Sequence, residues 1–81
     1  MGILRFIDLF AGIGGMHLGF DLAATQLGLK TELVLASELN KDARAVYEMN
    51  FGKQPLGDIR KIQNLPGHDV LLAGFPCQTF S

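Results

Sequence analysis

Several features that would define the class of a protein are scarce or absent in this sequence. It contains one cysteine, Cys77, so an internal disulfide is excluded and a reducing compartment is favoured. No apolar run approaches the ~20 residues that span a bilayer, and Asp8 interrupts the first apolar run too early for a signal peptide. The formal net charge is −1, so the chain has no basic excess with which to bind nucleic acid by itself. We expect no membrane association, and a location in the cytoplasm near the nucleoid of a bacterium or in the nucleus of a eukaryote.

Apolar residues, by contrast, are abundant. They make up 48% of the 81 residues, and the mean hydropathy is +0.25. A chain of this length buries only about 60% of the surface that its unfolded state exposes, so it cannot hide so much apolar surface alone. The composition is typical of the interior of a larger protein, and we expect a fragment or one part of a split protein. If the chain folds alone, its exposed apolar surface predicts self-association.

Hydrophobic periodicity predicts strands that alternate with helices. Near-continuous apolar strands are typical of a parallel sheet covered on both faces, and the segments between them have helical spacing. This order is typical of the α/β class with a doubly wound, mostly parallel sheet. The expected strands are residues 3–9, 33–36 and 69–73, with a short extended piece at 55–59; the expected helices are residues 14–27 and 41–50, with a helical turn near 60–64.

Within the expected helices, the spacing also predicts which residues are buried. His17 lies off the apolar stripe of the first helix, so we expect a surface or packing residue and not a ligand. In the second helix Asn40 is a candidate N-cap, and Tyr47 is expected in the core. The expected stripe of the first helix consists of Met16, Phe20, Ala23, Ala24 and Leu27.

The first expected strand leads into a glycine-rich loop, from Asp8 to Gly15. Glycines in such a loop reach positive φ and let a ligand approach the backbone, and the N–H groups of the next helix point at what binds there. The dinucleotide fingerprint Gly-x-Gly-x-x-Gly would require glycine where the sequence has His17, and no phosphate-binding P-loop is present. The loop indicates a nucleotide or cofactor site, with NAD and FAD less expected; a turn that only connects two elements is the alternative.

Acidic residues and the cysteine follow the carboxyl ends of the expected strands. In an open α/β sheet, ligands bind beyond these ends, where the strand order reverses. Glu38 lies 23 residues after Gly15, close to the ~20 expected for an acid that accepts hydrogen bonds from a ribose. Asp58 could accept a hydrogen bond from an exocyclic amine, so the two acids favour an adenosine-type cofactor without a pyrophosphate. From its position on a loop after Pro76, Cys77 could equally be a nucleophile or an inert thiol.

Four segments resemble motifs of the DNA cytosine-5 methyltransferase family, in the same order and with similar spacing. Phe-Ile-Asp-Leu-Phe-Ala-Gly-Ile-Gly-Gly at 6–15 is similar to the first motif, and Gly-Phe-Pro-Cys-Gln-Thr-Phe-Ser at 74–81 is similar to the fourth. Residues 37–40 and 57–59 are similar to the second and third. The resemblance implies a Rossmann-like, S-adenosylmethionine-dependent methyltransferase fold, with residues 1–81 as the N-terminal portion of the catalytic, cofactor-binding domain. It also implies methyl transfer to carbon 5 of cytosine in double-stranded DNA, in a restriction-modification system, without a metal site.

The resemblance further implies a role for each motif residue. Cys77 would be the nucleophile that attacks carbon 6 of a cytosine flipped out of the duplex. Glu38 would hold the ribose hydroxyls, Asp58 would read the adenine edge, and Leu39 would lie against the adenine, where many members carry an aromatic residue. The implied cofactor-binding residues are Phe10, Ala11, Gly12, Ile13, Gly14, Gly15, Glu38, Leu39, Asp58, Ile59 and Pro76, and the implied DNA contacts are Gln78 and Ser81.

The 81 residues stop at the nucleophile motif and lack the later motifs of the family. Among these are the Glu-Asn-Val motif, the arginine-bearing motif, the target recognition region and the C-terminal segment that completes the cofactor pocket. We therefore expect the chain alone to be inactive and to bind the cofactor weakly, if at all, with the remainder of the enzyme or a second copy as its partner. A tRNA cytosine-5 methyltransferase, a non-catalytic split subunit and an NAD-linked oxidoreductase are the alternatives.

Overall fold

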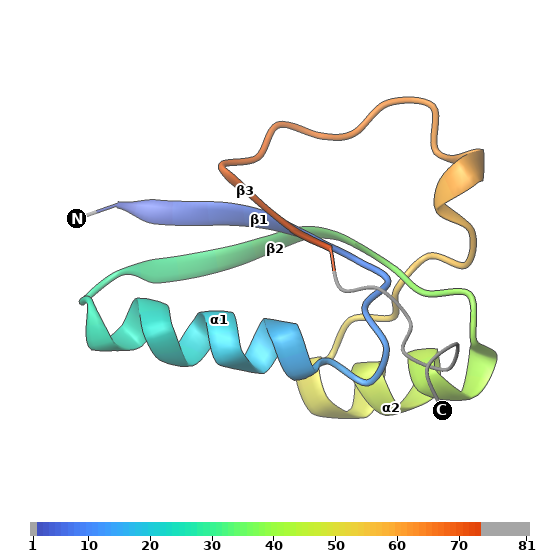
Figure 1. Cartoon of the computed structure of the whole chain (residues 1–81), viewed down its shortest axis with the longest axis horizontal. Helices are drawn as coiled ribbons and strands as arrows, with labels where there is room; N and C mark the ends of the chain where they lie inside the picture. Colours follow the sequence, from blue (N-terminus) through green and yellow to red (C-terminus); the bar gives the residue numbers. More distant parts are fainter. Residues whose placement is uncertain (1, 74–81) are drawn as a thin grey trace.

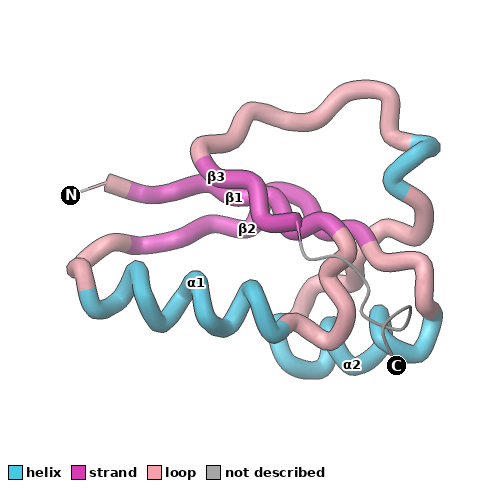
Figure 2. Tube along the Cα trace, in the orientation of Figure 1, coloured by secondary structure: helices cyan, strands magenta, loops and turns pink. Residues whose placement is uncertain are grey.

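A computed structural model describes residues 2–73, in which strands alternate with helices along the chain (Figures 1 and 2). This order confirms the predicted α/β class. Each predicted helix ends within one residue of its observed C-terminus, whereas the second strand begins three residues earlier than predicted. The elements are β1 (Ile3–Leu9), α1 (Gly15–Gln26), β2 (Lys30–Ser37), α2 (Lys41–Phe51), the 3-10 turn η1 (Ile59–Lys61) and β3 (Val70–Ala73).

The three strands form a parallel sheet in the order β2-β1-β3. Phe6 of the central strand β1 pairs with Leu33 of β2 and with Val70 of β3. The short extended piece predicted at residues 55–59 is reduced to a single parallel bridge between Leu56 and Ser37. Pro55 precedes this bridge and has no N–H with which to extend a ladder of hydrogen bonds.

The path of the chain places a switch in strand order beside β1. The chain leaves β1 for β2 on one side and later returns to β3 on the other side. Helices α1 and α2 lie below the strands in Figure 1, whereas the long connection that carries η1 arches above them. Ligands of open α/β sheets bind at such a switch, beyond the carboxyl ends of the strands. The glycine loop begins at that end of β1.

Helix α1 buries a different face from the predicted stripe. Ala24 is buried and Phe20 is half-buried, as predicted, but Met16, Ala23 and Leu27 are exposed. Leu27 lies beyond the last residue of the helix and is 76% exposed. The apolar pattern alone therefore misplaces the inward face of the helix by about one residue.

His17 occupies the inward position that the prediction assigned to Met16. It is only 6% exposed, its ring stacks on Phe51 with centroids 3.8 Å apart, and it meets the edge of Phe6 at 4.9 Å. The predicted packing role is confirmed, and the surface alternative is wrong. A histidine can turn inward here because buried polar partners accompany it, which hydrophobic periodicity cannot detect.

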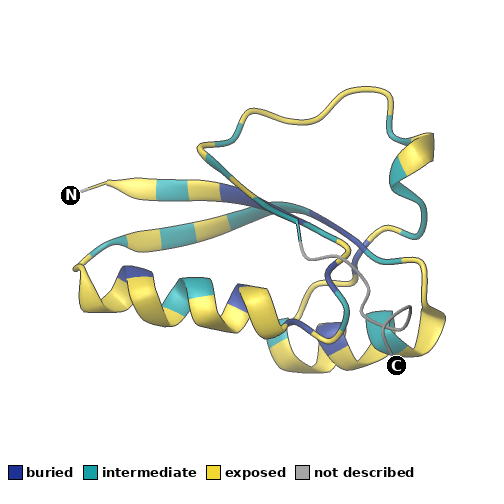
Figure 3. Ribbon diagram, in the orientation of Figure 1, coloured by how far each residue is buried: buried dark blue, intermediate teal, exposed yellow. Residues whose placement is uncertain are grey.

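The buried core is small, and much apolar surface stays exposed (Figure 3). Tyr47 is fully buried, as predicted, and packs with Ala11 and Ala36. Within residues 2–73, no helix is long and apolar enough to cross a membrane. The large apolar side chains that remain exposed include Ile3, Phe10, Ile13, Met16, Leu18, Leu22, Leu27, Leu39, Val46, Met49, Leu56, Leu65 and Leu71.

Candidate functional site

The glycine loop between β1 and α1 has three residues in left-handed backbone conformations. The φ angles are 54° at Phe10, 58° at Gly12 and 103° at Gly14. The N–H of Ala11 donates to the carbonyl of Ser37 at 2.9 Å, which fastens the loop to the end of β2. A non-glycine residue at positive φ, here Phe10, is uncommon and concentrates at functional sites.

Position 14 requires glycine for two reasons, the positive φ of its backbone and the close contact with Phe51. A Cβ at this position would overlap Cε2 of Phe51 and would lie 2.9 Å from its Cζ. At Gly12, by contrast, a Cβ would meet no atom within 4 Å. The loop is therefore tightly packed where α1 begins and open at Gly12, so a ligand can approach its backbone there.

Glu38 connects the glycine loop to the end of β2. Its Oε1 accepts a hydrogen bond from the N–H of Gly12 at 2.6 Å, and its Oε2 accepts one from the N–H of Asn40 at 2.9 Å. Each carboxylate oxygen can accept a further hydrogen bond. The structure thus brings together two residues that the sequence assigned to one site, and leaves the carboxylate able to accept hydroxyl donors.

The Arg44 side chain binds the backbone of Glu38 and of the residue after it. Its Nη1 donates to the carbonyls of Glu38 at 2.8 Å and of Leu39 at 2.9 Å. No sequence pattern predicts this role for Arg44, because the reach of a long side chain to loop carbonyls depends on the path of the loop and leaves no periodic signal. The side chain of Leu39 is 63% exposed beside this clamp.

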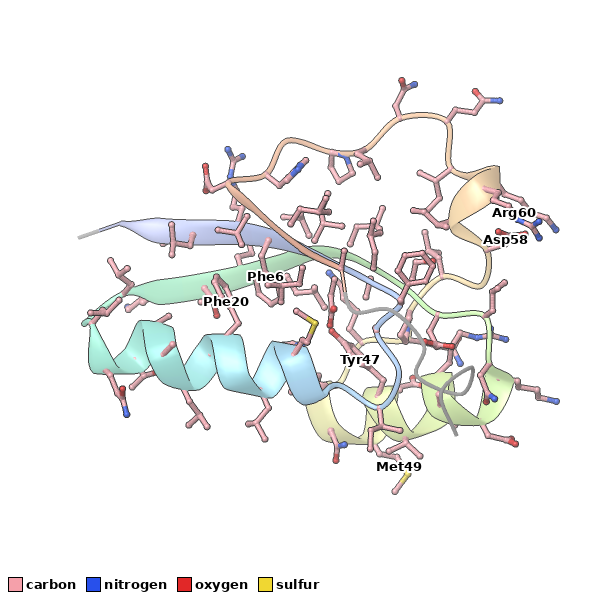
Figure 4. All side chains as sticks on the ribbon, in the orientation of Figure 1. Phe6, Phe20, Tyr47, Met49, Asp58 and Arg60 are labelled. Atoms are coloured by element: carbon pink, nitrogen blue, oxygen red, sulfur yellow. The ribbon has the colours of Figure 1, made fainter. Side chains whose placement is uncertain are left out.

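Asp58 lies near the end of β2 but is already engaged by η1. The Leu56–Ser37 bridge places this segment beside the end of β2. The Asp58 carboxylate accepts from the N–H of Arg60 at 2.9 Å and pairs with its guanidinium at 2.9 Å (Figure 4). These hydrogen bonds hold the pKa of Asp58 below its ordinary value. In this arrangement the carboxylate is the N-cap of η1.

The Asp8 carboxyl, at the end of β1, is the acid that the fold buries most deeply. It is 1% exposed and accepts a hydrogen bond from the Tyr47 hydroxyl at 3.1 Å. Burial raises the pKa of Asp8 to about 6, the Tyr47 hydrogen bond lowers it, and the nearby charge of Glu38 raises it. A tyrosine on the buried stripe of a helix needs a polar partner; that signal in the sequence could have identified this contact.

A hollow of about 380 Å³ lies between the glycine loop and the two helices. It is lined by Ile13, Gly14, Gly15, Leu18, Asn50 and Phe51. Three of these residues, Ile13, Gly14 and Gly15, are predicted cofactor-binding residues, whereas neither Glu38 nor Asp58 lines the hollow.

Comparison with known proteins places the chain in a family. The family described as C-5 cytosine-specific DNA methylase matches residues 4–81. The chain belongs to this family. This membership and the parallel sheet confirm the predicted Rossmann-like methyltransferase fold. The family match gives no support to the NAD-linked oxidoreductase.

Several similar proteins are named Type II methyltransferases. The chain is 60% identical over 79 residues to Type II methyltransferase M.HgiCI of Herpetosiphon aurantiacus, covering 98% of this chain and 19% of that protein. It is 54% identical over 78 residues to M.BanI of Aneurinibacillus aneurinilyticus, covering 96% and 18%. It is 50% identical over 80 residues to M.HhaI of Haemophilus parahaemolyticus, covering 96% and 23%. The chain spans about a fifth of the length of these relatives.

A solved structure supports the same conclusion for the fold. The crystal structure of the S. pombe Dnmt2 methyltransferase matches with a TM-score of 0.54 and 33% identity, over 68% of this chain and 16% of that one. The methylase-family match extends across the segment that contains Pro76, Cys77, Gln78 and Ser81. These four predicted site residues lie outside the described residues, so their roles stay predictions.

We expect Glu38→Gln to loosen the glycine loop of this methylase-family chain. Glutamine has an NH2 group in place of one carboxylate oxygen, so in this geometry either the Gly12 N–H or the Asn40 N–H would face a donor. Hydrogen bonds to a charged group contribute roughly 1.5–3 kcal/mol each, so the free energy of unfolding should fall by about 2 kcal/mol. Urea denaturation followed by circular dichroism measures this change. Glu32→Gln on the exposed part of β2 is the matched control, and equal losses in both variants would contradict the role of Glu38.

Proposed function

We propose that this chain carries the cofactor-binding loop and the nucleophile of a DNA cytosine-5 methyltransferase of a restriction-modification system. The observation that supports this most directly is the hydrogen bond between Gly12 N–H and Glu38 Oε1, at the switch in strand order. It joins the glycine loop to the acid expected to bind a ribose. Type II methyltransferase relatives with 50–60% identity support the substrate class.

The described residues fit S-adenosylmethionine. Glu38 has acceptor capacity left for ribose hydroxyls, Gly12 leaves open space, and exposed apolar side chains at Ile13 and Leu39 offer surface to a purine. The cofactor has no pyrophosphate, in keeping with a loop that lacks the dinucleotide fingerprint. When bound, it supplies a methyl group on a sulfonium. We assign it to the loop residues Phe10 to Gly15, to Glu38, Leu39, Asp58 and Ile59, and to Pro76.

In the proposed reaction, the Cys77 thiolate bonds to carbon 6 of a flipped cytosine, which makes carbon 5 electron-rich. Carbon 5 accepts the methyl group, then loses its proton to a base, and the bond to Cys77 breaks to restore the double bond and the thiolate. Gln78 and Ser81 would contact the DNA strand beside the flipped base. We expect this chemistry in the bacterial cytoplasm; the bacterial relatives give no support to a nuclear location.

Asp58 needs a rearrangement in this proposal, because η1 occupies its carboxylate. We propose that the carboxylate gives up part of its Arg60 pairing when the cofactor binds. The pair is largely exposed on the Arg60 side, with 81% of that side chain accessible, and exposed ion pairs contribute little stability. Replacing one hydrogen bond from Arg60 by a hydrogen bond from an exocyclic amine should therefore cost little free energy.

A chimera tests the proposed function. We would replace the matched segment of M.HgiCI, 19% of that protein, by these 81 residues and measure transfer of labelled methyl groups to duplex DNA and to tRNA. We expect transfer to duplex DNA, and a covalent adduct with DNA containing 5-fluorocytosine, detected by mass spectrometry.

Two controls interpret the chimera. Cys77→Ser should retain cofactor binding and lose both transfer and adduct, because an alcohol is a far weaker nucleophile than a thiolate. The 81-residue chain alone should show no transfer.

Three other outcomes would contradict the proposal or its parts. Preferential transfer to tRNA by the chimera would favour the tRNA methyltransferase. Cofactor binding without transfer in the chimera would favour a non-catalytic subunit, and turnover by the isolated chain would refute its expected inactivity.

A further inference from the structure

A chain of buried hydrogen bonds centres on the Tyr47 hydroxyl. This oxygen lies 3.1 Å from Asp8 Oδ2 and 2.7 Å from His17 Nδ1. All three side chains are buried, at 0%, 1% and 6% exposure for Tyr47, Asp8 and His17. Figure 4 shows Tyr47 reaching up from α2 toward the strands. One hydroxyl thus joins β1 and α1 to α2.

The chain continues from His17 toward the surface. His17 Nε2 lies 3.0 Å from Asp21 Oδ2, one turn further along α1. The other oxygen of Asp21 accepts from the Thr31 hydroxyl of β2 at 2.6 Å. The sequence predicts a surface or packing role for His17 and a core position for Tyr47. The structure also links both side chains into one polar chain across four elements.

This chain holds both ends of the glycine loop. Asp8 stands two residues before Phe10, and His17 stands three residues after Gly14, so the left-handed loop residues lie between them. The His17 ring cannot turn freely, because Phe51 stacks on it. A movement of either loop end away from α2 would therefore break the hydrogen-bond contact of Tyr47 with Asp8 or with His17.

The number of protons decides how many of these contacts are hydrogen bonds. The contacts Asp8–Tyr47, Tyr47–His17 and His17–Asp21 need three protons between them. With Asp8 ionised and His17 neutral, the tyrosine and one ring nitrogen supply only two, so two acceptors face each other at one contact. One added proton, on His17 or on Asp8, allows all three contacts to be hydrogen bonds.

We propose that Tyr47 and His17 are positioning residues of the cofactor loop, which they hold through one proton shared along Asp8, Tyr47, His17 and Asp21. The charged groups that face this chain are Glu38 beside Asp8 and Asp21 beside His17 and Tyr47, and β2 adds only the neutral Thr31 hydroxyl. Burial raises the pKa of Asp8 to about 6 and lowers that of His17, so the proton is taken up near pH 6. The importance of the loop for cofactor binding rests on the proposed function; the positioning itself does not.

NMR on the full 81-residue chain labelled with ¹⁵N tests this proposal. In a pH titration, the ring nitrogens of His17 and the amides of Gly12 and Gly14 should shift with one common midpoint near pH 6. In Tyr47→Phe, the common midpoint should be lost, and amide exchange at Gly12 and Gly14 should accelerate at least tenfold. Thr31→Val removes a hydroxyl of similar size at the outer end of the chain and should change exchange less than threefold.

Other outcomes separate the two proposals. If Tyr47→Phe does not fold, as judged by circular dichroism, His17→Gln should show the same acceleration. Separate midpoints in the wild-type titration, or unchanged exchange in a folded variant, would overturn the positioning role. An S-adenosylmethionine titration to millimolar concentration should show weak binding in the wild type and at least tenfold weaker binding in Tyr47→Phe. Failure of the chimera to bind the cofactor would count against the proposed function, while the exchange data would still decide the positioning role.

Discussion

Gly14→Ala is expected to lower the free energy of unfolding by about 3 kcal/mol. A left-handed conformation costs a non-glycine residue roughly 1–2 kcal/mol, and φ is 103° at Gly14. The new methyl group would also overlap Cε2 of Phe51, and overpacking costs typically about 1–3 kcal/mol. For a domain of this size, the melting temperature should fall by on the order of 15 °C. Thermal and urea denaturation measure both quantities.

Two further variants separate backbone strain from the clash. Gly12→Ala has positive φ but open space, so it should lose only about 1–2 kcal/mol. When Phe51→Leu is combined with Gly14→Ala, the cost of the alanine should fall by about 1 kcal/mol or more, because the clashing atoms are gone. Equal losses at Gly12 and Gly14, with no coupling to Phe51, would show that packing against α2 does not explain the glycine.

Asp8→Asn is expected to stabilise the chain at neutral pH and to flatten the pH dependence of its stability. Burial raises the pKa of Asp8 from 3.8 to about 6, so between these values the folded chain binds more protons than the unfolded chain. The stability contributed by protonated Asp8 is complete below about pH 4 and is lost as pH rises through 6. A shift of this size corresponds to ~3 kcal/mol. Urea denaturation from pH 4 to pH 8 should show the variant equal to the wild type at pH 4 and more stable by up to about 3 kcal/mol at pH 7.

The comparison between variant and wild type is needed because His17 has the opposite sign. Burial lowers the pKa of His17 below 6.5, so its contribution to stability is lost as pH falls through that region. Asp42→Asn, at an exposed position in the first turn of α2, is the matched control for the loss of one carboxylate. Parallel curves for Asp8→Asn and the wild type would show that Asp8 is not protonated on folding.

Much of the candidate site could be predicted because it depends on local chemistry and chain order. The glycine loop, Asn40 as the cap of α2 and Glu38 at the end of β2 are each marked by residue type and spacing. Their convergence follows from the rule that parallel strands deliver their carboxyl ends to one edge. The part of the prediction that failed, the buried stripe of α1, depended on periodicity in a helix with an inward histidine.

The sequence by itself determined the α/β class, the family and the position of the glycine loop, because these depend on apolar patterning and on motifs that short stretches contain. Only the tertiary structure decided which acids are buried and which long-range hydrogen bonds they accept. It buried Asp8, left acceptor capacity on Glu38 and joined Tyr47 to both ends of the loop. The hydrogen bond between Tyr47 and Asp8 joins residues 39 positions apart. It depends on how helices and strands pack, which no local sequence pattern records.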